Sequence, residues 1–335
     1  MAVCPGACAA APVRARGTAG TWYTAVVMKR DEGIAAWLIY VLVRGFCMIL
    51  LMFPLEWNLR TARLLGTIWW HLMPRHRERA REHLKIAYGD ALSPAETSRL
   101  ALRCLQQQAM WVMEFVFAPR LINEWTWRRH IRLVNMDEAL AQLLENRGAL
   151  LLTGHYGNWE LAGFLLAVLG FDVVAIMRPL DNAYLNRFLV KTRRRSGLEL
   201  LYKKGAAAEA ESIIRRGAAL GFIADQNAGR KGLFVDFFGR PASTYKSIGL
   251  LAVSQEVPII VGYARRIGDS FRYEVGAQRV IHPHEWRGRD DPLRWITQEY
   301  TAAIEAMIRV DPSQYLWIHR RWKSQPKGKR QAATG

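Results

Sequence analysis

The sequence predicts an α/β fold, with a mainly parallel sheet flanked by helices and a helical region in front of it. Two observations lead to this prediction. From residue 148 onward, short apolar runs of strand length alternate with helical segments, which is typical of βα units around a parallel sheet. Before residue 148 the apolar stretches are longer and helical, beginning with residues 34–53. No internal repeat or linker interrupts the chain, so we expect one body.

The first expected element is the apolar run IAAWLIYVLVRGFCMILLMF at residues 34–53. It has about the 20 residues that a bilayer-spanning helix needs, but Arg44 lies in its middle. An arginine at the centre of a spanning helix costs about 2.5 to 3.5 kcal/mol. A tilted or interfacial helix would let Arg44 reach the lipid head groups, and a helix docked on the protein would place it in a polar groove. We expect a membrane anchor here.

Three further helical segments are expected before the sheet begins. Residues 57–73 are rich in aromatic residues and end at Pro74, and residues 75–88 are strongly basic. Ser93 followed by Pro94 and Glu96 predicts a helix N-terminus, because serine caps helices, proline suits the first helical position and an acidic residue suits the first turn. This helix should be long and extend through Phe117.

The α/β core is expected at residues 146–323, after a helical region with its anchor helix at residues 28–145. Residues 1–27 and 324–335 are expected to be disordered tails, the second of them basic, and Met28 is a candidate start site. We expect strands at residues 150–153, 173–176, 198–202, 219–224 and 258–263, helices at residues 159–169, 183–195, 206–216, 244–254 and 292–308, and an antiparallel strand at residues 271–275 that pairs with residues 257–264.

Charge and composition restrict the class of partner. The net charge of +18 requires an acidic partner, which could be nucleic acid, an anionic membrane surface or an acidic carrier protein. Thirteen tryptophans and the apolar run favour the membrane surface, and no recognised nucleic-acid-binding motif is present. The four cysteines are too scattered for a metal site, and the sequence contains neither a P-loop nor a dinucleotide fingerprint. We therefore expect no metal, no cofactor and no nucleic acid.

The segment GALLLTGHYGNWE at residues 148–160 carries the strongest chemical signal. His155 follows an apolar strand, and Glu160 opens the next helix. We expect this turn to bring the Glu160 carboxylate to the imidazole. A carboxylate on one ring nitrogen fixes the tautomer and raises the basicity of the other nitrogen, which could then take a proton from a hydroxyl.

Further blocks follow in order, namely MRPLDNAYLNRF (residues 177–188), RRRSG (193–197), FIADQNAGRKGLFVDFFGRPAST (222–244) and QYLWIHRRWK (314–323). Together with GHYGNWE, they resemble the bacterial lipid A late acyltransferases, which transfer lauroyl or myristoyl groups, and the related phosphatidylinositol mannoside acyltransferases. The resemblance covers about residues 34–323. It implies a glycerolipid-acyltransferase-like fold and an anchor helix that is docked or shallow. It also implies a catalytic domain on the cytoplasmic side of the inner membrane.

The candidate site residues come from strand ends and from the resemblance. Ligands of parallel sheets bind outside the carboxyl ends of the strands, so His155, Arg178 and Asp225 should line one rim. The resemblance points to Arg193 as an essential arginine, with Arg194 and Arg195 as close competitors. Asp225 could orient an arginine or hydrogen-bond the acceptor. The expected catalytic residues are His155, Glu160, Arg193 and Asp225, and the expected substrate contacts are Arg178, Asn158, Arg195, Gln226, Arg320 and Arg321.

The implied reaction is direct acyl transfer. His155, oriented by Glu160, would remove the proton from an acceptor hydroxyl, which attacks an acyl thioester. The resemblance implies acyl carrier protein as donor, with acyl-CoA as the alternative, and a lipid A precursor as acceptor. A glycerolipid, a mannosylated phosphoinositide or another glycolipid is the alternative acceptor. A membrane lipid-binding protein without activity is the alternative outside the enzyme class.

Overall fold

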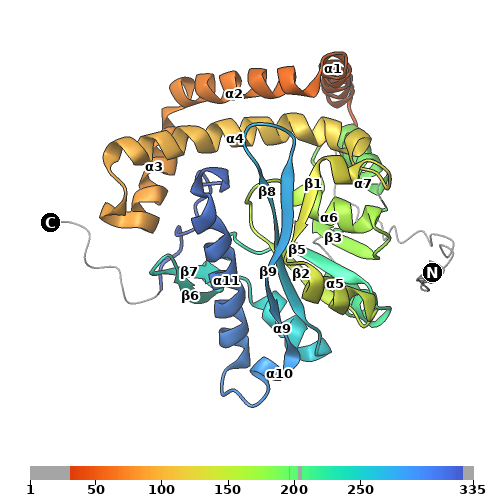
Figure 1. Cartoon of the computed structure of the whole chain (residues 1–335), viewed down its shortest axis with the longest axis vertical. Helices are drawn as coiled ribbons and strands as arrows, with labels where there is room; N and C mark the ends of the chain where they lie inside the picture. The colour runs from red at the N-terminus through yellow and green to blue at the C-terminus, as the bar shows by residue number, and fades with distance from the viewer. Residues whose placement is uncertain (1–30, 196, 203–205, 327–335) are drawn as a thin grey trace, which may run out of the picture.

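The computed structural model describes residues 31–195, 197–202 and 206–326 and shows a seven-stranded sheet with helices on both faces (Figure 1). The predicted α/β class is confirmed. The predicted N-terminal tail, the candidate start at Met28 and most of the predicted C-terminal tail lie outside the described residues.

The main sheet has the strand order β1-β9-β8-β2-β5-β3-β4. The strands from β8 to β4 run parallel, whereas β9 is antiparallel to β8 and β1 is parallel to β9. The bounds are β1 (Ile131–Val134), β2 (Ala149–Thr153), β3 (Val173–Met177), β4 (Glu199–Tyr202), β5 (Ala219–Ile223), β8 (Ile259–Arg266) and β9 (Tyr273–Ile281). β1 was not predicted, and since it precedes residue 146, the sheet begins earlier in the chain than the expected core.

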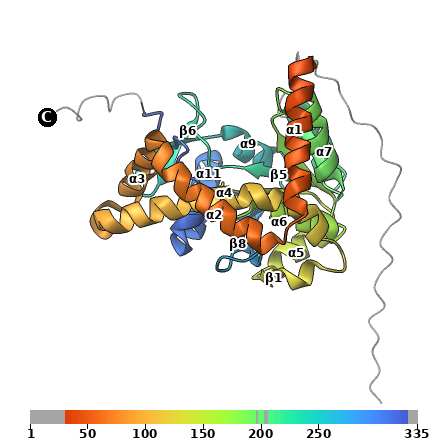
Figure 2. The same ribbon diagram turned by 90° about the horizontal axis from the view of Figure 1, so that it is seen from above.

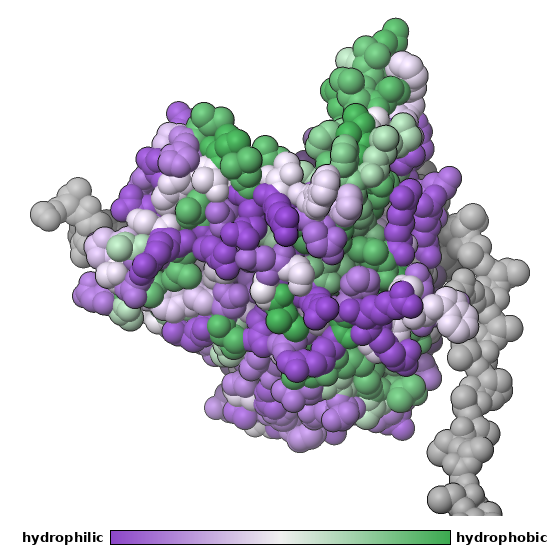
Figure 3. All heavy atoms as spheres, turned by 45° about the horizontal axis from the view of Figure 1, so that its top comes forward, coloured by the Kyte–Doolittle hydropathy of each residue, from purple (hydrophilic) through white to green (hydrophobic). Residues whose placement is uncertain are grey.

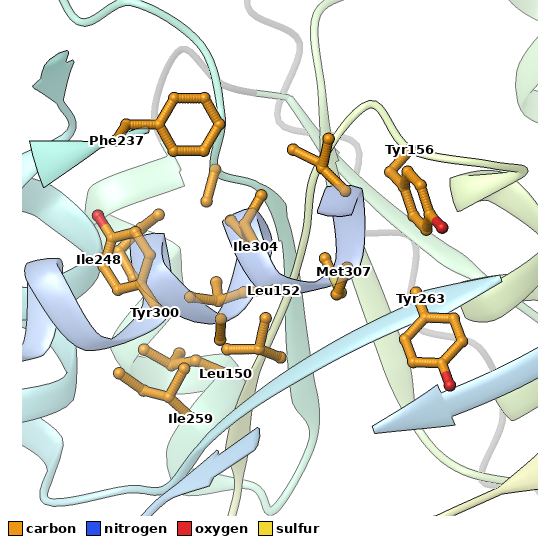
Figure 4. Packing of buried hydrophobic residues seen from close by; sticks show 14 of the residues in the cluster. Leu150, Leu152, Tyr156, Phe237, Ile248, Ile259, Tyr263, Tyr300, Ile304 and Met307 are labelled. Atoms are coloured by element: carbon orange, nitrogen blue, oxygen red, sulfur yellow. The ribbon is translucent and has the colours of Figure 1, made fainter. Parts of the chain in front are cut away.

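Helices cover both faces of this sheet because each face is apolar. On one face, α5 (Asp137–Leu144) and α6 (Trp159–Val168) share a buried cluster with β2, β3 and β5. On the other, α8 (Ala206–Arg215), α9 (Lys246–Gln255) and α11 (Pro292–Val310) do the same. Figure 4 shows Tyr300, Ile304 and Met307 of α11 packed beside Leu150 and Leu152 of β2. The short helix α10 (Pro283–Trp286) and the hairpin of β6 (Leu233–Phe237) and β7 (Arg240–Thr244) complete this side.

The N-terminal helices form a layer across one end of the sheet. They are α1 (Ile34–Leu51), α2 (Leu55–Leu72), α3 (Pro74–Tyr88) and α4 (Pro94–Leu121), and α4 starts with the predicted cap, a reciprocal pair between Ser93 and Glu96. α2 lies directly on α4 (Figure 1). A Cβ at Gly66 would be 2.5 Å from the Cα of Gln106, so only glycine allows this approach of the two backbones.

The apolar helix α1 lies along α7 (Ala183–Arg194), as Figure 2 shows from above. The Asn182 amide donates to the Ala36 carbonyl at 2.8 Å, and the Arg44 guanidinium lies 4.5 Å from the ring centroid of Phe188. Arg44 is therefore directed at α7. In the described part of the chain, α1 is the one helix long and apolar enough to cross a membrane, and 17% of it is buried.

Candidate active site at the carboxyl edge of the sheet

His155 and Asp225 meet at the carboxyl edge of two neighbouring parallel strands. His155 follows β2 and Asp225 follows β5, and Thr153 lies opposite Ile223 where the strands end. Nδ1 of His155 donates to Oδ1 of Asp225 at 2.8 Å, and the backbone N–H of His155 donates to Oδ2 at 2.9 Å. The aspartate thus holds both the ring and the main chain of His155, which leaves Nε2 to act on a substrate.

The prediction that Glu160 contacts the imidazole is wrong. Glu160 lies in the first turn of α6 and is directed toward α7, where Nε of Arg193 donates to its Oε2 at 2.9 Å and Nη2 contacts Oε1. Asp225 occupies the place beside His155 because its strand is the neighbour of β2 in the sheet. Asp225 therefore binds histidine and not arginine, and Glu160 and Arg193 form a second pair.

The environment of the first pair favours a basic imidazole. Burial opposes the charging of His155, but the Asp225 carboxylate, with a smaller contribution from Glu160, raises the pKa of His155 above its usual value. Burial also opposes the charge on Asp225, yet His155 lowers the pKa of this carboxyl to about 2. The aspartate is therefore ionised at neutral pH, and it stabilises the imidazolium that forms when His155 takes a proton.

Three side chains lie near Nε2 and its ring. The Gln226 amide nitrogen is 3.4 Å from Nε2, and the Trp159 ring meets the imidazole edge to face with 5.0 Å between centroids. The His319 ring lies parallel to the His155 ring at 6.3 Å, and its Nε2 accepts the backbone N–H of Asn227 at 3.3 Å. Burial lowers the pKa of His319. His319 belongs to the block QYLWIHRRWK, but nothing in the sequence pattern places it beside His155.

Arg321 and Asn158, two of the expected substrate contacts, are bonded within the protein instead. Arg321 is buried, and it donates to the Gln226 carbonyl at 3.2 Å, to Thr244 Oγ1 at 2.6 Å and to the Ser243 carbonyl. Asn158 is also buried and caps α6. Both hold the loops of the site and present no surface to a ligand. Of the other candidates, Gln226 lies at the rim, whereas Arg178 after β3, Arg195 after α7 and Arg320 are exposed.

Gly157 makes the turn between His155 and Glu160 possible. Its φ is +57°, and a Cβ there would lie 2.0 Å from the Ala264 carbonyl oxygen. The next residue, Asn158, donates its backbone N–H to that same oxygen at 2.9 Å. A side chain at position 157 would break this contact with β8, so the second glycine of GHYGNWE has a steric cause.

A buried ion pair between Arg266 and Glu114 stabilises the same turn through Asn158. Arg266 of β8 donates from Nη2 to Glu114 Oε2 of α4 at 2.8 Å and from Nε to Gln107 at 2.8 Å. The side chains of Arg266 and Glu114 are 3% and 0% exposed. Glu114 also accepts from the Asn158 amide at 3.2 Å and from the Tyr273 hydroxyl. The network links α4, the sheet and the active-site turn, and sequence reasoning could not find it because its partners are far apart in the chain.

Glu114→Ala should destabilise the protein by about 3 to 5 kcal/mol, since it leaves the Arg266 charge buried without its carboxylate. The double variant Glu114→Met with Arg266→Met should recover much of that loss, because no buried charge is left unpaired. Denaturant unfolding of both variants measures this. A loss below about 1 kcal/mol for Glu114→Ala would show that water solvates Arg266.

Comparisons with known proteins show which family the sequence resembles. The family model described as bacterial lipid A biosynthesis acyltransferase matches residues 30–324. The lipid A biosynthesis lauroyltransferase of Escherichia coli (strain K12) is 23% identical over 79% of this chain and 84% of its own length. The palmitoleoyltransferase of the same strain is 25% identical over 76% of this chain and 81% of its own length. The phosphatidylinositol mannoside acyltransferase of Mycolicibacterium smegmatis is 23% identical over 61% of this chain and 66% of its own length.

Proposed function

The chain belongs to the bacterial lipid A biosynthesis acyltransferase family and is an O-acyltransferase, and from this we propose that it moves a fatty acyl chain from a thioester to a hydroxyl of a lipid A precursor. The observation that carries the proposal is the pair of His155 and Asp225 at the carboxyl edge of the sheet, with Nε2 of the imidazole directed away from the carboxylate.

The proposed reaction is one direct displacement. Nε2 of His155 takes the proton of the acceptor hydroxyl as its oxygen attacks the thioester carbonyl carbon. The tetrahedral intermediate then collapses, the carbon–sulfur bond breaks, and the imidazolium returns the proton to the leaving sulfur. Arg193, oriented by Glu160 at 2.9 Å, and the N-terminus of α6 are the proposed sources of positive charge for the oxyanion. The expected pair of histidine and glutamate thus becomes histidine and aspartate, with Glu160 acting on Arg193.

An aromatic cluster beside His155 is consistent with an apolar acyl group as the part that is transferred. The rings of Trp111 and Trp159 are stacked with 4.4 Å between centroids, and Phe115 lies next to Trp111. The Arg193 guanidinium is 6.0 Å from the Phe115 centroid. The acyl chain would therefore pass between the proton acceptor and the arginine. The donor we propose is acyl carrier protein, an acidic partner for a chain of net charge +18, with acyl-CoA as the alternative.

The function is tested by incubating the purified protein with labelled acyl carrier protein or acyl-CoA and a lipid A precursor, followed by mass spectrometry of the lipid product. One added acyl group on the precursor is the expected result. Transfer to a glycerolipid or a mannosylated lipid alone would identify a different acceptor. Lipid binding without transfer from either donor would favour the non-catalytic alternative.

We propose that the enzyme sits on the cytoplasmic side of the inner membrane and that α1 and α2 form its lipid-contacting surface. Leu42 of α1 is 72% exposed and Leu64 of α2 is 60% exposed, so both helices present large apolar side chains to the outside. The opposite side of α2 packs on α4, which itself contacts the active-site aromatics through Trp111. An apolar layer over the catalytic edge would bring a lipid hydroxyl within reach of His155.

The double variant Leu42→Gln with Leu64→Gln should weaken binding to phospholipid vesicles by at least about tenfold, because each fully buried leucine contributes about 1.5 to 3 kcal/mol. The matched control is Leu144→Gln with Leu250→Gln, which are 67% and 54% exposed on α5 and α9. Vesicle flotation in high salt measures the apolar contribution, since salt screens exposed charges. Equal losses for the two double variants would contradict this orientation.

A further inference from the structure

The outer side of α7 carries an open groove that the proposed chemistry does not use. Its volume is about 380 Å³, and its walls consist of one apolar and four cationic side chains. Val190 is buried at the helix, and the four cations are exposed around it. The lining residues are Arg187, Val190, Lys191, Arg194 and Arg195.

The groove and the active site use different sides of the same helix. Arg187, Lys191 and Arg194 follow one another at helical spacings of four and three residues, so they project from one side of α7. Arg193 projects elsewhere and meets Glu160 at 2.9 Å. Glu32 pairs with Arg187 at 3.2 Å, but both side chains are more than half exposed, so this pair is weak. Several cationic side chains at this spacing make the local potential positive, which favours an anion in the groove.

The groove lies beside the helix that we place at the membrane. Tyr184 of α7 contacts Tyr40 of α1 with 6.0 Å between ring centroids, and Phe188 lies under Arg44. On its other side α1 exposes apolar residues such as Leu42 and Phe46. Figure 3 shows this apolar ridge rising next to strongly hydrophilic surface. When the ridge enters the bilayer, the groove lies at the level of the lipid head groups.

We infer that this groove binds a phosphate monoester on the head group of a lipid substrate. Guanidinium groups bind phosphate oxygens in a bidentate manner, and several cations in one groove match a group with nearly two negative charges better than a diester with one. An acidic protein is the less favoured ligand, because the groove adjoins lipid-facing side chains. The inference rests on the proposed function in one respect, that the acceptor is a lipid reached at the membrane.

Calorimetric titration of the full-length protein in non-ionic detergent with water-soluble, short-chain phosphatidic acid tests the inference without requiring catalysis or vesicles. Short-chain phosphatidylglycerol, a diester, is the comparison ligand. The test variant is Lys191→Gln, Arg194→Gln and Arg195→Gln. The control removes the same charge from exposed residues near α10, at the end of the molecule far from α1 (Figure 1), with Arg287→Gln, Arg289→Gln and Arg294→Gln.

The unaltered protein and the control should bind the monoester more tightly than the diester, and the test variant should bind the monoester at least about tenfold more weakly. Equal affinity for the two lipids, or equal affinity of the two variants, would overturn the inference. A loss confined to binding of acyl carrier protein, titrated in the same way, would also overturn it and make the groove a donor site. A failure of the proposed function can be told apart from a failure of this inference. In the first case the protein would still bind the phosphate monoester, and only acyl transfer would be absent.

Discussion

Alanine in place of His155 should remove nearly all acyl transfer, lowering kcat/KM by about 10³-fold or more, because it removes the imidazole whose Nε2 takes the proton. The measurement is steady-state transfer from labelled acyl carrier protein to the lipid acceptor. Both substrates should still bind, since the ring of His155 forms only a small part of the rim.

The alanine variant also leaves the Asp225 carboxylate, 1% exposed, without its side-chain partner, so a loss of folding could imitate a loss of catalysis. His155→Asn controls for this, because an asparagine amide can donate to Asp225 but cannot act as a base. We expect both variants to be inactive and the asparagine variant to unfold close to the temperature of the unaltered protein. A folded His155→Asn protein that retains more than a tenth of the activity would exclude His155 as the base.

The general position of the site could be predicted from the sequence because it depends on local order along the chain. An apolar strand followed by His155 and another followed by Asp225 suffice to place both at the carboxyl edge of a parallel sheet, whatever else the fold contains. The cap at Ser93 and the strand bounds follow from equally local rules. The described structure agrees with these predictions within a few residues, except that the antiparallel strand expected at residues 271–275 is the longer β9, Tyr273–Ile281, which pairs with β8.

The partners within the site could not be predicted, because they depend on which strands are neighbours. Glu160 is close to His155 in sequence, but Asp225 follows β5, the neighbour of β2 in the sheet, and occupies the space beside the imidazole. Spacing along the chain cannot reveal that β5 inserts between β2 and β3. The pair of Glu114 and Arg266 has the same cause, since α4 and β8 meet only in the folded molecule.

Local patterns also failed where strands are short or partly polar. β1 has four residues, and its Arg132 is exposed, so it lacks the apolar run that identified the other strands. The β6 and β7 hairpin turns at Phe238 and Gly239, both with positive φ, and a phenylalanine in that conformation is not a usual turn signal. Tertiary contacts stabilise both elements, which explains why the sequence pattern alone did not identify them.

Asp225→Asn should lower kcat/KM at neutral pH by about 10²- to 10⁴-fold and should move the acid limb of the pH profile. Asparagine can donate to Nδ1, which places the proton on Nε2, the atom that has to accept one. The carboxylate raises the pKa of His155, and the reaction requires the neutral imidazole, so activity falls as the pH drops through that raised value. Without the negative charge the pKa of His155 falls, and the residual activity should therefore persist to lower pH.

Glu160→Gln distinguishes this role of Asp225 from a general loss of negative charge. Glu160 acts on the His155 pKa only through its field and hydrogen-bonds to Arg193 instead, so its amide should lower kcat while moving the acid limb less than Asp225→Asn does. Full pH profiles of kcat/KM for the two variants and the unaltered enzyme provide the comparison. A larger movement for Glu160→Gln would mean that Glu160 turns to the imidazole when substrate is bound. In that case the contact between Asp225 and Nδ1 would belong to the resting enzyme, and the direct pairing of His155 with Glu160 would be restored as the catalytic arrangement.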